Sequence, residues 1–565
     1  MLFKDFADRL ALVDGETSRL KITKMLALML KELETKEVRK AVYLMLGGLE
    51  APFRSIEFMM ADKMVIRAMA KVSGMETEEV NERFKKLGDL GLVMEQINKS
   101  KRSAGLNLME VYRMLRSTAL ESGEGSQERK VESLSNLLAK LNSIEVKFVV
   151  RIVLNKLRLG FSDKTVLDAL SYLANGDKSA RTKLESAYQV LPDIGLLAEK
   201  VISQGIEKAT YKIEPVLGVP VMSMLCQRLK SPAEMIIKMG EVAVEPKFDG
   251  TRVQIHFDKA KNAVRTFTRN LKESSAMFPE LKKMGDFVSA ESVILDCEAI
   301  GLNEEREAMV TFQKTMQRKR KHDIEAMARA VPVKFYVFDI LFKDGISLLN
   351  ETYLKRREIL EETIKPGGVL MLDDYRLTFV PEEIRKWHKQ MLDKGLEGVI
   401  VKRLGSRYVP GRTGWRWVKM KEVEESAAKL SDTIDAVIMG YSYGQGKRAS
   451  FGIGKFLVGI KDGKNFKTLT RVGTGLKDED FRQLKVKLDR LMIKDKPENY
   501  LVTKAQLPDV WVEPGVVVEI AGDEITKSPS HTAGVALRFP RMVRLRQDKG
   551  PEQVTTVSEL KELAV

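Results

Sequence analysis

The sequence predicts a multidomain protein, in which an all-α domain (residues 1–216) precedes an α+β domain (217–423) and a β-barrel domain (424–565). Three observations predict this order. Apolar residues recur at helical spacing through roughly the first 200 residues, and later they alternate or cluster in short runs typical of strands. A proline- and glycine-rich segment, EPVLGVP (214–220), separates the two patterns as a linker would. A chain of 565 residues also suits three or four domains of about 150 residues each.

The helical prediction rests on apolar stripes in the first domain. Residues 22–33 and 38–49 place Ile, Leu, Met and Val three and four positions apart, which predicts one buried face on each of two helices. EVKFVVRIVLNKLRLG (145–160) predicts a helix that ends at its glycine, and SDKTVLDALSYL (162–173) predicts one that begins at a serine cap. ESGEGSQ (121–127) predicts a loop. These stripes indicate a helical core and carry no chemistry of their own.

Segments of the middle domain are rich in β-branched and aromatic residues and predict strands. They are VAVEPKF (242–248), TRVQIHF (251–257), AVRTFTR (263–269), SVILDCEAI (292–300), VKFYVFDIL (333–341) and EGVIVKR (397–403). Because helical stretches lie between them, we expect an α+β arrangement.

The C-terminal domain is strand-rich again. Strands are expected at AVIMGYSY (436–443), FLVGIK (456–461), FKTLTRVG (466–473), VWVEP (510–514), VVVEIAG (516–522) and ALRFPRMVRLR (536–546). One helix, roughly 478–492, interrupts them. Five or so strands and one helix in about 135 residues suit a small barrel such as the OB-fold.

Composition excludes several classes of protein. No stretch approaches the roughly 20 apolar residues of a membrane span, and the N-terminal MLFKDFADRLALVDG has acids inside its apolar run, unlike a signal peptide. Two cysteines, Cys226 and Cys297, cannot form a four-cysteine zinc site, and the four histidines show no metal-binding spacing. Lys and Arg total 95 against 79 acids, and a net charge of +16 favours an anionic partner such as nucleic acid. We expect a cytoplasmic protein with no membrane partner.

A lysine flanked by acids is the first candidate for chemistry. In EPKFDG (245–250), strand alternation predicts Glu245, Lys247 and Asp249 on one face. Taken alone, the pattern is typical of a solvated strand end whose lysine forms a surface ion pair. If Lys247 is a nucleophile, exposing its lone pair at pH 7 costs on the order of 4–5 kcal/mol, because a free lysine titrates near about 10.4. Burial, neighbouring cations and a bound divalent metal lower this cost.

Further candidates lie on the later strands of the middle domain. They are Arg252, Arg269, Asp296, Glu298, Phe338, Glu397, Lys402, Lys419 and Lys421. Each alone has an ordinary structural explanation, such as a surface charge or, for Phe338, core packing. In WVKMK (417–421), alternation puts the tryptophan and both lysines on one face and the valine and methionine in the core. Glu397 and Lys402 lie five apart, so they share a face only if Glu397 precedes the strand or Gly398 forms a bulge.

The ordered series K-x-D-G, D-x-E, E-G-x-x-x-K and W-x-K-x-K resembles the motif series of the covalent nucleotidyltransferases, which are ATP-dependent DNA ligases, RNA ligases and mRNA-capping enzymes. The flanks extend the likeness. FVVRIVLNKLRLGFSDKTVLDAL resembles the helical DNA-binding domain of archaeal and eukaryotic DNA ligases. GVPVMSMLCQRL resembles the segment that leads into their catalytic domain, and LRFPRMVRLRQDK the motif that closes their OB domain. Nearly the whole chain is covered, and it is above all similar to archaeal replicative-type DNA ligases.

The resemblance implies a DNA-binding domain, an adenylation (nucleotidyltransferase) domain and an OB-fold domain, in this order. It implies that Lys247 attacks the α-phosphate of ATP and carries AMP, which passes to the 5′-phosphate of a nick in duplex DNA before the 3′-hydroxyl seals the strand. ATP or AMP contacts are implied for Glu245, Arg252, Arg269, Glu298, Phe338, Lys402, Arg412, Lys419 and Lys421. Glu298 and Glu397 would hold Mg²⁺.

The resemblance also implies contacts with macromolecules. Arg318, Lys319, Arg320 and Lys321 in QRKRKHD are expected to contact the DNA backbone, although a solvated helix end explains the run equally well. Arg538 and Arg541 are expected to contact phosphates. A sliding clamp is an expected partner of a monomeric enzyme, and KSKRSAGLNLMEVY (99–112) is a degenerate candidate for its binding segment.

Alternatives remain within and outside this superfamily. An RNA ligase or capping enzyme is disfavoured by the helical region of about 200 residues, which those enzymes usually lack. An NAD-dependent ligase is disfavoured because two cysteines cannot build its zinc module. A non-catalytic nucleic-acid-binding scaffold is disfavoured by the complete motif series.

Overall fold

The computed structural model describes residues 1–565 except 99–101, 230, 304–308, 310–314, 316–317, 319–327, 366, 412–413, 422–432, 523 and 563–565. The chain forms two compact units. The first comprises Met1–Met59, Gly105–Glu124 and Ile152–Glu422, and the second comprises Met60–Ala104, Gly125–Arg151 and Val423–Val565. No helix among the described residues is long and apolar enough to cross a membrane.

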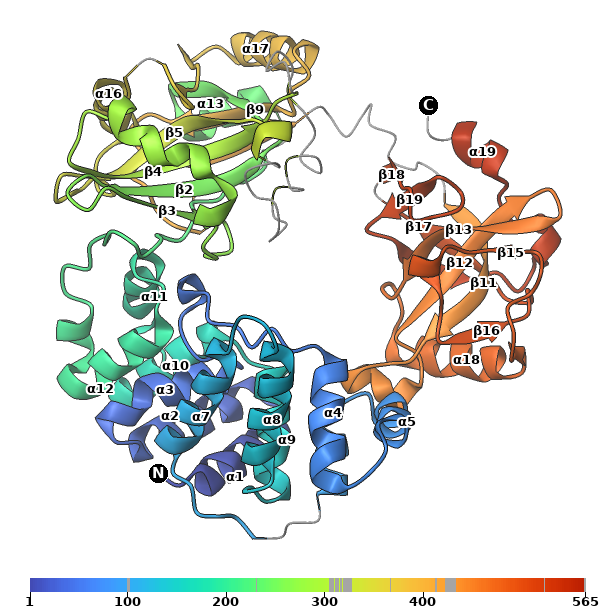
Figure 1. Ribbon diagram of the computed structural model, residues 1–565. Helices are drawn as coiled ribbons and strands as arrows, with labels where there is room; N and C mark the ends of the chain where they lie inside the picture. Colours follow the sequence, from blue (N-terminus) through green and yellow to red (C-terminus); the bar gives the residue numbers. More distant parts are fainter. Residues whose placement is uncertain are drawn as a thin grey trace. The chain divides into compact units, whose positions relative to one another are not determined.

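The N-terminal part of the chain is helical, as predicted (Figure 1). Its helices are α1 (Phe3–Asp14), α2 (Arg19–Glu32), α3 (Thr35–Met45), α4 (Asp62–Ser73), α5 (Thr77–Leu87), α6 (Leu90–Ile97), α7 (Leu108–Leu120), α8 (Ser126–Leu138), α9 (Ser143–Val153), α10 (Asp163–Asn175), α11 (Arg181–Val190) and α12 (Ile194–Ala209), with a 3₁₀ turn η1 (Pro52–Arg54). Within the first unit α2 packs on α10 and α3 on α12, and within the second α4 packs on α8.

Two details of the predicted helices differ. The helix predicted to reach Gly160 ends at Val153, because Asn155 (φ 52°) and Arg158 (φ 61°) take the left-handed backbone conformation that breaks a helix. Ser162 does occupy the N-cap position of α10, but its side chain makes no cap hydrogen bond. The apolar stripes are correct, since Ile22, Leu26, Met29 and Leu30 of α2 are all buried.

The middle of the chain forms two antiparallel sheets with helices around them. Its elements are α13 (Pro232–Met239), β1 (Val242–Lys247), β2 (Thr251–Asp258), β3 (Ala263–Thr268), η2 (Ser275–Met277), η3 (Pro279–Phe287), β4 (Ser292–Gly301), β5 (Val333–Lys343), β6 (Ile346–Ser347), α16 (Tyr353–Thr363), β7 (Leu370–Leu372), β8 (Arg376–Thr378), α17 (Pro381–Asp393), β9 (Gly398–Arg403) and β10 (Trp417–Lys421). The first sheet has the order β10-β9-β1-β8, and the second has the order β3-β2-β4-β5-β6, with β7 parallel to β5.

Each sheet buries one face against helices. Val242 and Val244 of β1, with Val399, Val401 and Val418 of the neighbouring strands, pack against α13 and α17, which lie side by side (Figure 1). On the second sheet, alternate residues of β2, β4 and β5 pack against η3 and α16. The opposite, inner faces carry the polar residues.

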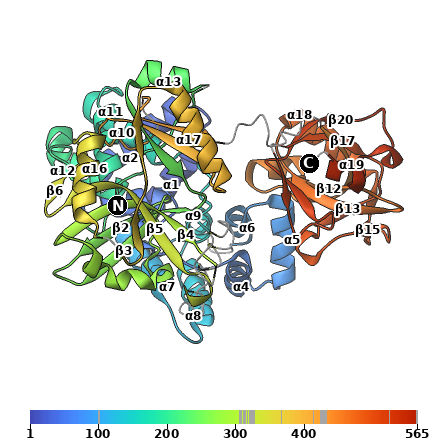
Figure 2. The same ribbon diagram turned by 90° about the horizontal axis from the view of Figure 1, so that it is seen from above.

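The C-terminal part is strand-rich, as predicted. Its elements are β11 (Ile434–Ser442), η5 (Gly446–Phe451), β12 (Lys455–Asp462), β13 (Asn465–Val472), α18 (Asp478–Asp489), β14 (Met492–Ile493), β15 (Tyr500–Leu501), η6 (Lys504–Gln506), β16 (Val510–Val512), β17 (Val517–Ala521), β18 (Glu524–Lys527), β19 (Val535–Arg538), β20 (Arg541–Leu545), η7 (Pro551–Gln553) and α19 (Val557–Glu562). β12 lies between β11 and β13, and β15 follows β13. Figure 2 shows β12, β13 and β15 in this part of the chain. Phe481, Leu484 and Leu488 of α18 pack on the core of this sheet.

Candidate active site

The inner face of the first sheet collects the predicted lysines. In the strand register, Lys247 of β1 lies opposite Gly398, Glu245 lies opposite Ile400, and Lys419 of β10 also lies opposite Ile400. Residues opposite each other in an antiparallel pair share a face, so Glu245, Lys247 and Lys419 point to the same side. Val418 instead packs in the core with the α13 and α17 side chains, which confirms the predicted alternation in WVKMK.

Lys247 ends β1 with its side chain 19% exposed. Its ammonium forms an ion pair with Glu397 and lies 3.4 Å from the Phe248 carbonyl oxygen. The Glu397 amide in turn donates to the Lys247 carbonyl at 3.0 Å. Glu397 precedes β9, which begins at Gly398 with a φ of 131°, a conformation that favours glycine. This arrangement answers the five-residue spacing problem, because Glu397 reaches the site from before the strand.

Glu298 lies on the inner face of the second sheet, opposite Arg252 in the strand register. Burial raises the pKa of Glu298 to about 7, although the nearby cations Lys247 and Arg252 oppose the rise. Glu397 also interacts electrostatically with this carboxyl and raises its pKa further. Lys247, Glu298 and Glu397, predicted from three separate motifs, are therefore brought together between the two sheets.

Arg252 is held by protein groups. Its guanidinium donates to both Asp296 oxygens at 3.0 and 2.6 Å and to the Met224 carbonyl at 2.7 Å. Tyr408 donates to Asp296 at 2.8 Å, so the carboxylate is fully engaged. Burial lowers the pKa of Arg252, but the charge of Asp296 outweighs it and the net pKa is raised. The guanidinium carbon lies 5.3 Å from the centre of the Phe338 ring, which is the face-on distance of a cation–π contact.

Lys402, a predicted nucleotide contact, is buried among protein partners in this structure. Its side chain is 0% exposed, and its ammonium lies 2.5 Å from Glu245 and 3.1 Å from the Phe338 carbonyl oxygen. The same nitrogen lies 4.4 Å from the centre of the Trp417 ring. The Lys402 ammonium is therefore occupied by protein partners in this structure. Lys402 joins Glu245 of the first sheet to Phe338 of the second.

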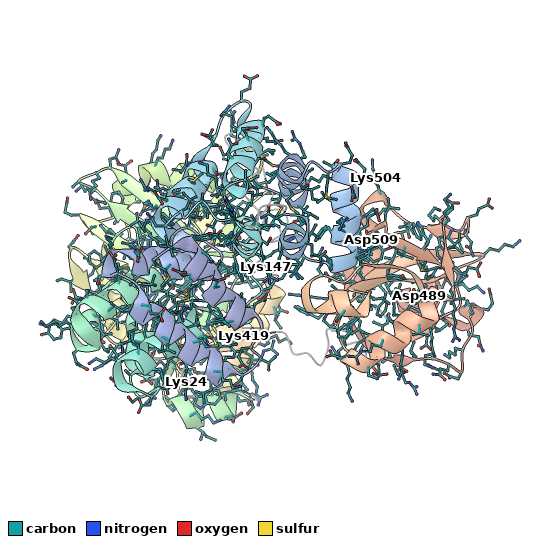
Figure 3. The ribbon with its side chains drawn as sticks, turned by 90° about the horizontal axis from the view of Figure 1, so that it is seen from below. Lys24, Lys147, Lys419, Asp489, Lys504 and Asp509 are labelled. Atoms are coloured by element: carbon teal, nitrogen blue, oxygen red, sulfur yellow. The ribbon has the colours of Figure 1, made fainter. Side chains whose placement is uncertain are left out.

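The structure describes only some of the other predicted nucleotide contacts. Lys419 is half-buried on β10 (Figure 3), and Arg269 is exposed directly after β3. Lys421 ends β10, and its side chain is not described. Arg412 lies outside the described residues.

Arg318 is a correction to the predicted DNA contacts. Its side chain is 1% exposed, and its guanidinium makes two hydrogen bonds to Glu280 at 2.8 and 2.9 Å. This geometry is typical of a structural ion pair and leaves no exposed surface for a phosphate. Lys319, Arg320 and Lys321 lie outside the described residues.

The C-terminal arginines divide into two groups. Arg538 and Arg541 are exposed, as a phosphate contact requires. Arg544 donates to Glu519 at 2.6 Å, and Arg546 donates to both Asp435 oxygens at 3.0 and 2.9 Å. Arg544 and Arg546 therefore hold strands of the C-terminal part together.

Several site residues escaped the sequence reasoning. Tyr353 donates to Glu245 at 2.5 Å, and Tyr408 binds Asp296. Tyr336 stacks on Phe248, with ring centres 4.2 Å apart. Tyr336 lies two positions before Phe338 on a strand, so alternation could have placed both on one face. Tyr353 and Tyr408 lie outside the strands and gave no such signal.

Glu298 and Glu397 are the acidic residues of the site that could bind a metal ion. In the part of the chain that the structure describes, no three His, Cys, Asp or Glu residues gather closely enough to hold a metal ion. The carboxylates of Glu298 and Glu397 interact electrostatically, and both offer the hard oxygen atoms that Mg²⁺ prefers.

Comparisons with known proteins show which family the chain is similar to. Family models described as DNA ligase N terminus, ATP dependent DNA ligase domain and ATP dependent DNA ligase C terminal region match residues 2–171, 223–421 and 449–549. A probable DNA ligase of Dictyoglomus turgidum is 39% identical over 577 residues, covering 100% of this chain and 97% of the relative. DNA ligase 1 of Methanosarcina acetivorans is 38% identical over 580 residues, covering 99% of each chain.

A solved structure shares the fold. The structure named Pmar-Lig_Pre has a TM-score of 0.52 at 15% sequence identity, covering 96% of this chain and 99% of its own. The N-terminal, catalytic and C-terminal models match in chain order, and the two relatives align over nearly the full length of this chain. The chain belongs to the ATP-dependent DNA ligase family.

Proposed function

We propose that this protein seals nicks in duplex DNA at the expense of ATP, with Lys247 as the nucleophile that carries AMP. The position of Lys247 supports this most strongly. It ends β1 on the inner face of the sheet, partly exposed, beside Glu397 and within electrostatic reach of Glu298. An ordinary surface lysine would have neither the second sheet opposite it nor a half-buried acid among its neighbours.

The reaction is a series of three transfers at phosphorus. In the first, the Lys247 nitrogen, after losing a proton and leaving Glu397, bonds to the α-phosphorus of ATP, and pyrophosphate departs with the electrons of the broken bond. In the second, a 5′-phosphate oxygen at the nick attacks the same phosphorus, and the nitrogen leaves and takes up a proton. In the third, the 3′-hydroxyl attacks the 5′-phosphorus, its proton is removed, and AMP leaves.

Side chains around Lys247 have complementary tasks in this proposal. Phe338 receives the purine on its ring, which is an ordinary use of a half-buried aromatic residue at the floor of a pocket. Lys419, Lys421, Arg269 and Arg412 balance phosphate charge. Arg252 and Glu245 shape the nucleoside pocket from behind, since both are already bound by protein partners.

Mg²⁺ fits the two carboxylates on the inner faces. Glu298 and Glu397 would supply hard oxygen ligands, with the phosphates and water supplying the rest. When bound, the ion would neutralise phosphate charge as it develops. Glu397 binds the lysine in this structure, so the same carboxylate would have to leave the amine before attack.

The remaining parts of the chain are proposed to bind the DNA. The proposed domains are a helical DNA-binding domain (1–216), an adenylation domain (217–423) and an OB-fold domain (424–565). Basic residues on all of them, including Arg538 and Arg541, would contact phosphates, so that affinity falls steeply with salt. We propose a cytoplasmic monomer that seals nicks in DNA replication, recombination and repair, with a sliding clamp as a partner.

A labelling experiment tests the proposal. Protein freed of bound AMP is mixed with Mg²⁺ and ATP labelled on the α-phosphate, denatured, and analysed for acid-labile label on the chain. We expect label on the wild type and on Lys261→Ala, an exposed lysine paired with Asp258, and none on Lys247→Ala. The labelled enzyme is then mixed with nicked DNA or nicked RNA, and transfer of AMP to DNA alone is expected. A wild type that takes up no label, or a Lys247→Ala variant that labels equally well, would overturn the proposal.

A further inference from the structure

Both carboxylate oxygens of Glu245 are engaged by protein donors. The side chain is 1% exposed. One oxygen accepts a hydrogen bond from the Tyr353 hydroxyl at 2.5 Å, and the other lies 2.5 Å from the Lys402 ammonium. A buried carboxylate oxygen without a donor is destabilising. Loss of either donor, Tyr353 or Lys402, would therefore also weaken the position of Glu245 and of the other donor.

Lys402 carries this arrangement across to the second sheet. Besides Glu245, its ammonium donates to the Phe338 carbonyl at 3.1 Å. The nitrogen also lies 4.4 Å from the Trp417 ring centre, 4.9 Å from that of Phe338 and 5.1 Å from that of Tyr353. One ammonium thus holds the backbone and ring of Phe338 in place relative to β1 and β10. Movement of Lys402 would break its hydrogen bond to the Phe338 carbonyl and its contact with the Phe338 ring.

Tyr353 is itself fixed. It opens α16, whose next turn anchors the helix to the protein interior through two arginines. Arg356 donates to both Asp339 oxygens at 2.6 and 2.9 Å, and Arg357 forms an ion pair with Asp373. Burial, with the adjacent Glu245 charge, raises the pKa of Tyr353, so the phenol stays protonated and can serve only as a donor to the carboxylate.

We infer that Tyr353 is a positioning residue for ATP binding, whose hydroxyl holds the Glu245–Lys402 pair and, through Lys402, sets the Phe338 ring that receives the purine. This inference rests on the proposed function, because it assumes that Phe338 stacks on the adenine. Tyr353 does not touch the reacting atoms. Its loss should weaken nucleotide binding and leave the chemical step at Lys247 nearly unchanged.

The substitution Tyr353→Phe removes the hydroxyl and keeps the ring. We expect the KM for ATP in lysine adenylylation to rise about ten- to a hundredfold, the range for losing one hydrogen bond to a charged group, with kcat within about twofold of wild type. Tyr112→Phe is the matched control. It removes another buried hydroxyl, which donates to the Leu49 carbonyl at 3.0 Å on the helical part, and it should lower the melting temperature without changing KM.

A double-mutant cycle separates positioning from general stability. If Tyr353 acts through Lys402, Tyr353→Phe should change KM less than twofold in a Lys402→Met background, in contrast to its effect in the wild type. An unchanged KM in Tyr353→Phe, equal losses in KM and kcat, or a full effect in the Lys402→Met background would each overturn the inference. Failure of the wild type to form the labelled adduct would instead overturn the proposed function, so the two failures are distinguishable.

Discussion

The substitution Glu298→Gln is expected to stabilise the enzyme at pH 8 while abolishing its activity. Burial raises the pKa of this carboxyl to about 7 from an ordinary value of 4.5. Between these two values the folded protein binds the proton more tightly than the unfolded chain does, so stability falls as pH rises through this range. The pKa difference corresponds to about 3 kcal/mol of unfolding free energy. This stability is fully present below pH 4 and is lost above pH 7.

Glutamine has nearly the same shape and never ionises, so it removes this cost. The variant and the wild type should therefore differ by less than about 1 kcal/mol at pH 5 and by about 3 kcal/mol at pH 8. Scanning calorimetry at the two pH values measures the difference, followed in the transition of the domain that contains Glu298. Lysine adenylylation should be lost at both pH values, because the carboxylate is the proposed Mg²⁺ ligand.

A second glutamate provides the control of opposite sign. Partial burial raises the pKa of Glu273, but hydrogen bonds from Arg265 outweigh burial and leave the pKa below its ordinary value. A carboxyl with a lowered pKa stabilises the fold above its unfolded pKa, so Glu273→Gln should destabilise the protein at pH 8. The reasoning fails if Glu298→Gln gains no stability between pH 5 and pH 8, or if the two variants shift in the same direction.

Three further changes test other parts of the structure. In Gly250→Ala, the added Cβ would lie 2.6 Å from the backbone oxygen of Ala299, and calorimetry should show a loss of about 1–3 kcal/mol with slower adenylylation. Arg318→Gln leaves Glu280 without its partner, and unfolding should show a loss of about 2 kcal/mol while the salt dependence of DNA binding is unchanged. Arg541→Ala should lower the slope of log K against log salt by about 1 in nick-binding titrations. An unchanged melting temperature for Arg318→Gln would restore it as a candidate DNA contact.

Helices and strands were predictable wherever the spacing of apolar residues matched a single type of secondary structure. The apolar stripes of the first domain gave α2 and α3, and the alternating runs gave β1, β2, β4 and β9 within one or two residues of their observed ends. Short edge strands such as β8 were missed, because three residues contain no period that can be measured. The end of α9 was missed for a different reason. Its sequence remains apolar and basic beyond Val153, and only the left-handed backbone at Asn155 stops the helix.

The candidate site was predictable as a set of residues, and its internal contacts were not. Strand parity alone puts Glu245, Lys247 and Lys419 on one face, and this is what the register gives. Parity cannot tell which cation stays exposed and which is buried. Lys402 and Lys419 look alike in sequence, yet one has no exposed surface and the other is half-buried. The burial of Lys402 depends on the second sheet, which covers it. The pattern of residues along β9 or β10 does not show how close that sheet lies.

The sequence also does not show which arginines are buried in ion pairs. Within the described residues, Arg252, Arg318 and Arg356 each form two hydrogen bonds to one carboxylate, and all three are at least largely buried. Each of these buried pairs adds nothing to the net charge of +16, because the carboxylate cancels the arginine, and neither charge reaches the surface that DNA meets. The number of basic residues therefore overstates how many cations can contact a polyanion, although the net charge itself is unchanged. The salt slope of nick binding should follow the exposed cations such as Arg541, because only those release counterions from the phosphates they contact.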